Sequence, residues 1–236
     1  RIPHSGVEMR PMPPKLLALL PDFWRCNSRL WGDKLGQISL ATTTLFWGVS
    51  GNMRYIVLAW AAAALHYSTT QAASLVGVVA LGTAVGAIAA SMRVRLERAT
   101  TVMPLGMIMG ALVIGMVFVR DLWVAVPLLI VMGGLGGYIV VPMNALLQHR
   151  GHNLMGSGRS IAVQNFNEQA CILGLGALYS FSTGAGLSAF GAIALFGGVV
   201  VAAMLLIQLW YRHNLRHHTA EVKQLMRIAR GKRHDG

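Results

Sequence analysis

Charged residues are scarce in this sequence, where Asp, Glu, Lys and Arg together make up 12% of 236 residues. An ordinary soluble domain carries roughly 25%. Hydrophobic residues reach 55%, which is more apolar side chain than a soluble domain of this size can bury. We therefore expect a lipid bilayer to surround most of the chain.

Acidic residues are the scarcest charged type, with 8 Asp and Glu against 20 Lys and Arg, for a net charge of +12. Such an excess indicates nucleic-acid binding only if the basic residues share one folded surface. Here they cluster between long apolar runs, which is typical of membrane proteins, so we expect no nucleic-acid partner. The only cysteines, Cys26 and Cys171, form neither a metal-ligand spacing nor a disulfide framework.

Catalytic motifs are also missing from the sequence. It has no phosphate-binding loop of the Gly-x-x-x-x-Gly-Lys type, so ATP-driven transport by this chain is not expected. No cluster of His, Cys and Glu suggests a metal site, and no serine has a histidine partner in the same layer. We expect no enzymatic activity, no catalytic residue, no cofactor and no metal.

Six long apolar stretches dominate the sequence instead. Each is long enough to cross a bilayer, which takes about 20 residues, and the short polar breaks between them force neighbouring spans to run antiparallel. The stretches are 36–64, 70–91, 101–119, 122–147, 160–183 and 187–211. The predicted fold class is all-α: a polytopic membrane protein with six transmembrane helices.

The distribution of Lys and Arg predicts how these spans are oriented. If the spans alternate in direction, 18 of the 20 basic residues fall on one side, Arg120 falls on the other, and Arg54 lies inside the first span. Positive charge marks cytoplasmic loops, so both ends of this segment are expected in the cytoplasm.

Three regions follow from this pattern. Residues 1–35 are expected to form a cytoplasmic, proline-containing linker, and residues 36–211 a six-helix bundle. Residues 212–236 form a basic tail, which is either an amphipathic helix on anionic lipid or a disordered segment. Because the first residue is Arg1 rather than Met, we expect the chain to be a piece of a longer protein.

Polar residues inside the spans are the candidate site. Arg54 and Glu168 are charged and lie near mid-span, where such residues are costly and usually functional. They either pair with each other and fix the helix register, or line a substrate path. Gln164 shares a helix face with Glu168, Asn165 lies near that face, and Asn144 ends the fourth span.

Glycines recur at a spacing that favours close helix packing. The pairs Gly82–Gly86 and Gly106–Gly110 are four residues apart, and a glycine cluster occupies 133–137. Small residues at this spacing let helices approach closely. The cluster, together with Pro142, could instead bend or hinge the fourth span.

Six spans with both ends inside resemble one half of a major facilitator superfamily transporter, in which two six-helix halves surround a central path. The segments 44–48 and 53–60 resemble the seventh span of the bacterial lysophospholipid transporter family (LplT). The segments 136–151 and 156–168 resemble its tenth and eleventh spans. This resemblance implies that the chain is the C-terminal half, and that the N-terminal six-helix half of the same protein is its partner.

The resemblance also implies a function and a substrate-binding site. The family moves lysophospholipids, chiefly lysophosphatidylethanolamine, across the bacterial inner membrane to the cytoplasmic leaflet, where an acyltransferase restores the missing chain. Its seventh-span arginine matches Arg54, and its eleventh-span polar residues match Gln164, Asn165 and Glu168; Asn144 joins them as a candidate. The alternatives are a general superfamily exporter of amphipathic compounds and a non-transporting membrane scaffold.

Overall fold

The computed structural model describes residues 19–222 and 224–225, and this part of the chain is helical with no β-strand. A short helix, α1 (Leu20–Gly32), precedes a bundle of long helices. These are α2 (Gly36–Leu65), α3 (Thr69–Arg93), α4 (Pro104–Gly115), α5 (Leu122–Met155), α6 (Ser157–Gly184) and α7 (Ala189–His217). The 3-10 segments η2 (Leu96–Val102) and η3 (Met116–Phe118) flank α4. The predicted all-α membrane fold is confirmed.

The six predicted stretches coincide with α2, α3, the η2–α4–η3 segment, α5, α6 and α7. Four of these are long and apolar enough to cross a membrane by length and composition: Thr69–Arg93, Leu96–Phe118, Leu122–Met155 and Ala189–His217. The other two, α2 and α6, carry the polar residues that were singled out from the sequence, including Arg54 and Glu168. The polar candidate residues are therefore what lowers the hydropathy of α2 and α6.

Capping side chains set where several helices begin. The Ser68 hydroxyl accepts from the Gln71 backbone N–H in a capping box. The Asp121 and Ser188 side chains cap α5 and α7 by accepting from the backbone N–H groups of Trp123 and Gly191. Such caps satisfy backbone donors that the first turn leaves free. The predicted break at 148–159 is largely helical: α5 continues to Met155, and Gly156, with φ +83°, separates it from α6.

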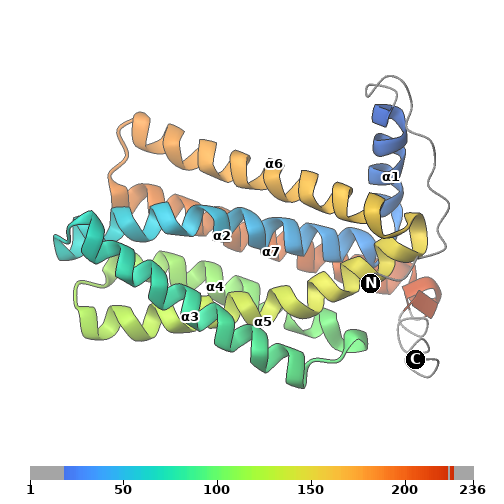
Figure 1. Cartoon of the computed structure of the whole chain (residues 1–236), viewed down its shortest axis with the longest axis horizontal. Coiled ribbons are helices and arrows are strands. Elements are labelled where there is room, and N and C mark those ends of the chain that lie inside the picture. The colour runs from blue at the N-terminus through green and yellow to red at the C-terminus, as the bar shows by residue number, and fades with distance from the viewer. Residues whose placement is uncertain (1–18, 223, 226–236) are drawn as a thin grey trace, which may run out of the picture.

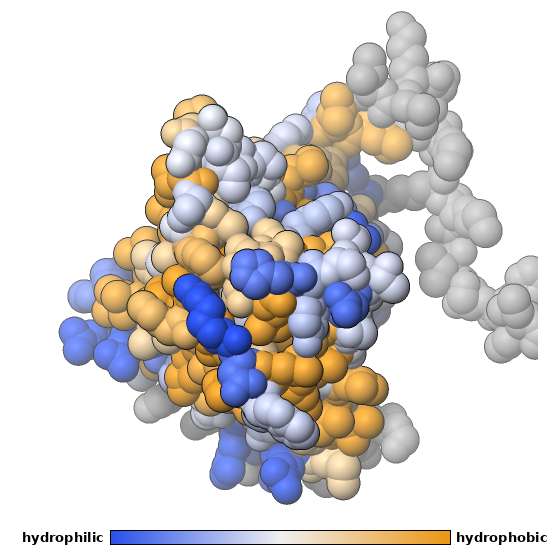
Figure 2. Space-filling model, turned by 90° about the vertical axis from the view of Figure 1, so that its left-hand side faces the viewer, coloured by the Kyte–Doolittle hydropathy of each residue, from blue (hydrophilic) through white to orange (hydrophobic). Residues whose placement is uncertain are grey.

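Successive long helices alternate in direction, and α1 and the end of α7 lie at the same end of the bundle (Figure 1). The basic breaks after α3 and α5 also lie there, and we call this the basic end. Figure 2 views the opposite end, where hydrophilic residues lie among hydrophobic ones. Phe118, Trp123 and Phe181 are 79%, 87% and 77% exposed near that end, as expected of aromatic residues at a membrane surface.

The glycines of α3 and α5 bring these two helices into backbone contact. A Cβ added at Gly86 would lie 1.9 Å from the carbonyl oxygen of Gly134, and one at Gly82 would lie 2.3 Å from that of Ile130. From the other side, a Cβ at Gly133 would lie 2.1 Å from the carbonyl oxygen of Val79. The prediction that these glycines serve helix packing is confirmed. The helix is unbroken through Pro142.

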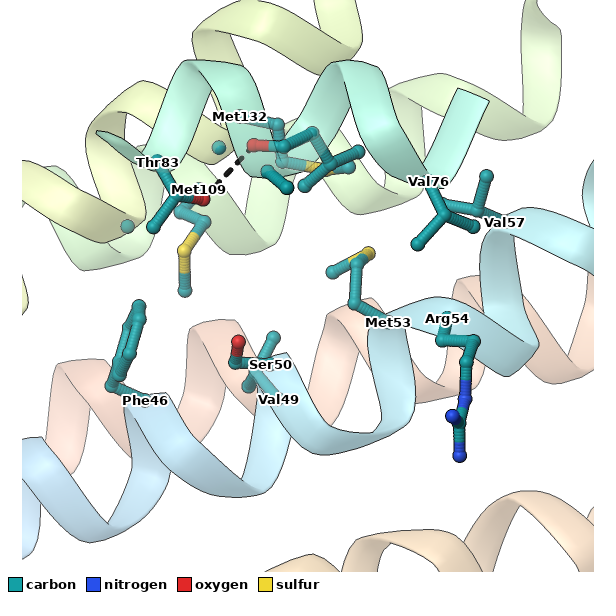
Figure 3. A pocket seen from close by; sticks show the side chains of 14 residues that line it. Phe46, Val49, Ser50, Met53, Arg54, Val57, Val76, Thr83, Met109 and Met132 are labelled. Carbon is teal, nitrogen blue, oxygen red and sulfur yellow. Dashed lines mark hydrogen bonds between the residues drawn. The ribbon is translucent and has the colours of Figure 1, made fainter. Parts of the chain in front are cut away.

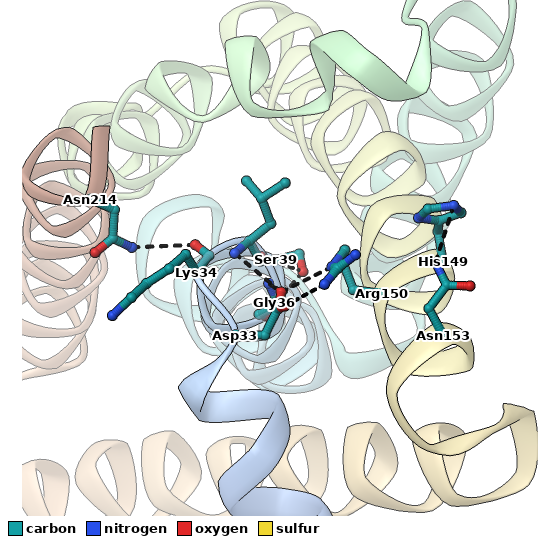
Figure 4. Close-up of polar contacts among 9 residues, drawn as sticks. Asp33, Lys34, Gly36, Ser39, His149, Arg150, Asn153 and Asn214 are labelled. Atoms are coloured by element: carbon teal, nitrogen blue, oxygen red, sulfur yellow. Dashed lines mark hydrogen bonds and ion pairs between the residues drawn. The ribbon is translucent and has the colours of Figure 1, made fainter. Parts of the chain in front are cut away.

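A buried ion pair holds the basic end together (Figure 4). The Asp33 carboxylate accepts from the Gly36 backbone N–H at 2.7 Å, and it forms a two-bond ion pair with the guanidinium of Arg150 on α5. Both side chains are less than a tenth exposed. The Asn214 side chain of α7 donates to the Lys34 carbonyl oxygen at 3.3 Å. The turn before α2 is thus tied to α5 and α7.

The predicted linker 1–35 contains helix α1, which runs across the end of α6 (Figure 1). Asn167 of α6 donates to Asn27 at 2.9 Å and accepts from Trp31 at 3.2 Å. At the other terminus, α7 extends to His217, beyond the predicted limit of 211. Residues 223 and 226–236 of the predicted basic tail lie outside the described residues.

Candidate functional site

Three of the five predicted site residues form a hydrogen-bonded trio, of which Gln164 and Glu168 are buried and Asn144 is partly exposed. The Gln164 side-chain amide donates to Asn144 Oδ1 and to Glu168 Oε1, each at 2.7 Å. Gln164 and Glu168 are one helical turn apart on α6, which is why their side chains meet, and they are 6% and 8% exposed. Asn144 reaches them from α5, so the trio joins the two helices.

Asn165 does not join this trio. It follows Gln164 directly, and the helical turn between them places it on the exposed side of α6. Gln169, one turn further along, is exposed as well. This side of α6 therefore presents amide side chains outward, while the trio faces α5.

Arg54 and Glu168 do not form the ion pair that was one reading of the sequence. Arg54 instead donates to the hydroxyl of its neighbour Tyr55 at 2.8 Å and lies over the Tyr55 ring at 4.8 Å. Arg54 is exposed, whereas Glu168 is buried. Among the described residues neither side chain forms a salt bridge.

The packing of α2 against α6 explains this separation. Asn52 donates to the Ile172 carbonyl oxygen at 3.0 Å, and thereby sets the level at which the two helices meet. Glu168 lies one turn before Ile172, and Arg54 lies two residues beyond Asn52 on a helix running in the same direction (Figure 1). At 1.5 Å per residue the two charged residues are offset by roughly 9 Å along the helix axes.

Asn52 is a buried polar residue whose role the sequence did not reveal. It is 5% exposed, and it also donates to the Gly48 carbonyl oxygen at 2.8 Å. A Cβ at Gly176 of α6 would lie 2.8 Å from Asn52 Oδ1, so a glycine is needed opposite it. In the sequence, the only signal for this contact is that both spans carry polar and small residues nearby.

An apolar cavity of about 270 Å³ lies between α2, α3, α4 and α5 (Figure 3). Its walls include Val49, Met53, Val57, Val76, Met109 and Met132. Arg54 also borders it, but its guanidinium points away from the cavity (Figure 3). Sequence reasoning missed this cavity, because its residues are ordinary apolar residues and only the packing of four helices brings them together.

The sequence is similar to several curated bacterial transporters. It is 34% identical over 200 residues to the proteins named "Lysophospholipid transporter LplT" of Escherichia coli O1:K1 / APEC and of Escherichia coli O6:K15:H31. That match covers 84% of this chain and 50% of each relative. The protein of the same name from Enterobacter sp. (strain 638) is 38% identical over 191 residues, covering 80% of this chain and 48% of the relative.

No family model and no solved structure matches this chain. The matched region extends over most of the helical bundle, and the chain spans about half the length of the curated relatives it matches. Together with the all-α membrane fold, this similarity at 34–38% identity over about 80% of the chain supports its assignment to the LplT family.

Proposed function

We propose that this chain is one half of a transporter that moves lysophospholipids across the bacterial inner membrane. The observation that carries the proposal is the similarity to proteins named lysophospholipid transporters at 34% and 38% identity. In the two-halved transporter architecture the substrate path runs between the halves near mid-membrane. The partner we propose is the N-terminal six-helix half of the same protein.

Arg54 has the chemistry that the phosphate of a lysophospholipid requires. Its guanidinium is exposed, and it forms no ion pair within residues 19–222. An arginine can bind a phosphate through two parallel hydrogen bonds, which a lysine ammonium cannot do. The Tyr55 hydroxyl holds the guanidinium on the side away from the apolar cavity. We therefore assign the phosphate contact to Arg54.

Glu168 has the chemistry that an ethanolamine amine requires. A carboxylate buried in a spanning helix is costly unless a cation compensates it, and none of the described residues does so. Gln164 orients the carboxylate through its hydrogen bond, and Asn144 in turn fixes Gln164. We propose that the trio binds the amine of lysophosphatidylethanolamine, and that Asn165 contacts the substrate from the exposed side of α6.

We propose that transport runs toward the basic end of the bundle. The basic end carries the arginine-rich breaks and is proposed to face the cytoplasm. A lysophospholipid delivered to the cytoplasmic leaflet becomes available for re-acylation, so an acyltransferase is the proposed downstream partner. Transport itself needs no covalent step at this site.

Uptake of labelled lysophosphatidylethanolamine by spheroplasts that express the complete transporter tests this function. Loss of a charge-assisted phosphate contact should lower the uptake by Arg54→Ala about tenfold or more, and Arg54→Lys should recover little of it. Arg120→Ala is the matched control. Arg120 lies at the end of the bundle opposite the basic end, and it donates to the Val117 carbonyl oxygen. Wild-type uptake by a well-inserted Arg54→Ala protein would refute the phosphate role.

The charge swap Arg54→Glu with Glu168→Arg separates binding from a purely structural pairing. Because the two residues are offset and form no ion pair in this structure, the swap should not restore uptake. Recovery of most of the uptake by the double variant would show that the residues act as a structural pair.

A further inference from the structure

The cavity between α2, α3, α4 and α5 has walls suited to a hydrocarbon chain. Its only hydroxyl groups belong to Ser50 and Thr83, and the Thr83 hydroxyl is already donated to the Val79 carbonyl oxygen at 2.9 Å. A water molecule in a buried site needs two to four polar partners. The interior does not supply them, so the chemistry of the walls favours an alkyl group over water or a polar ligand.

The size of the cavity fits part of a lipid chain. An apolar cavity of about 150 Å³ can hold a benzene molecule, and this one has about 270 Å³. Three methionines, Met53, Met109 and Met132, line it. Methionine side chains are flexible and adapt to irregular shapes, so these walls can accommodate chains that differ in length or unsaturation.

The mouth of the cavity lies beside a cation. Ser50, Arg54 and Ala80 border it and are exposed, whereas the methionines inside it are less than a tenth exposed. The Arg54 guanidinium points away from the cavity on the outside of α2 (Figure 3). An amphipathic molecule with an anionic head and one apolar tail reaches both across the edge of α2, with its head at the Arg54 guanidinium outside the cavity and its tail inside.

We propose that this cavity is the binding site for the end of the single acyl chain of the transported lipid. The proposal rests on the proposed function, and it adds a site for the tail to the site for the headgroup. A tail that stayed in a water-filled path between the two halves would keep its apolar surface hydrated. Burying the tail in the cavity removes that cost, and it raises the affinity about fourfold for each methylene taken from water.

Photolabelling tests the site directly. The probe is a lysophosphatidylethanolamine with a diazirine at the end of its palmitoyl chain, applied to the transporter in native membranes. Label should appear on Met53, Met132 and their neighbours in the cavity wall. Ala80→Phe, which fills the mouth, should reduce this label about 16-fold, as expected when two methylenes lose their site. Ala84→Phe, one turn along α3 and exposed outside the cavity, should leave it unchanged.

Label confined to Leu81, Val85 and Ile88, the exposed outer face of α3, would overturn the proposal, as would cavity label that Ala80→Phe does not change.

Uptake assays separate this proposal from the proposed function. Equal uptake of the palmitoyl lipid by Ala80→Phe and wild type would remove the tail site and leave transport standing. Cavity labelling that depends on Ala80 in a protein without any lysophospholipid uptake would remove the function and leave the alkyl site standing.

Discussion

The backbone contact between α3 and α5 predicts that Gly86→Ala will be strongly destabilising. The added Cβ would lie 1.9 Å from the carbonyl oxygen of Gly134, and Cβ contacts essentially never fall below 3.0 Å. The two helices must therefore separate by about 1.1 Å at this point. A gap of 0.5–1 Å already forfeits a quarter to a half of the dispersion energy of each contact.

The expected cost can be estimated from these distances. Overpacking a well-packed interior typically costs about 1–3 kcal/mol, and here the obstructing atoms are backbone that cannot rotate away. We expect about 3 kcal/mol, less roughly 1 kcal/mol for the better helix propensity of alanine. For a protein of this size that corresponds to a fall in Tm of roughly 4–8 °C.

A thiol-reactive dye can follow the unfolding of the detergent-solubilised protein, because Cys26 is 4% exposed in the folded state and becomes reactive when the bundle opens. Two matched controls lie on the same helices. At Gly77 an added Cβ meets nothing within 4 Å, and at Gly134 its nearest contact is at 3.6 Å, so both alanine variants should melt at or above the wild-type Tm. Wild-type stability of Gly86→Ala would refute the close approach of α3 and α5.

Two further predictions concern the basic end and the orientation of the bundle. Asp33→Ala and Arg150→Met should each cost about 3–5 kcal/mol, because each leaves a buried charge unpaired, and the double variant should cost less than their sum; additive losses in thermal melts would contradict the pair. Gly158 and Gly184 lie near opposite ends of α6, and an added Cβ meets nothing within 4 Å at either. In intact spheroplasts a membrane-impermeant maleimide should label Gly184→Cys and not Gly158→Cys; labelling of Gly158→Cys alone would reverse the orientation.

The spans and their breaks could be predicted from the sequence because both depend on local properties. Hydropathy sets which residues enter the bilayer, and caps such as Ser68 and Asp121 set where helices begin. Glycine packing between α3 and α5 was also predictable, since a repeat of four residues places small side chains on one helix face. The continuation of α5 to Met155 was not predicted, because its last turns are polar but still helical.

The contacts between distant residues were harder to predict. Asp33 and Arg150 are 117 residues apart. In the sequence analysis Arg150 contributed only to the charge distribution that predicts the orientation of the spans. Arg54 and Glu168 have opposite charges at similar depths, which suggested a pair. Which side of α2 meets α6 is decided by Asn52 and the glycines around it, and that packing leaves Arg54 on the exposed side. The Gln164–Glu168 contact was predictable, since both lie on one helix.

The central claim is that Arg54 binds the phosphate and that Glu168 binds the amine of a lysophospholipid. The most direct test compares spheroplast uptake of lysophosphatidylethanolamine, which has both groups, with that of lysophosphatidylglycerol, which lacks the amine. Arg54→Ala should lower uptake of both lipids about tenfold or more. Glu168→Gln, which can keep the hydrogen bond to Gln164, should lower uptake of the ethanolamine lipid alone. Unchanged uptake by Arg54→Ala, or an equal loss of both lipids by Glu168→Gln, would contradict this assignment.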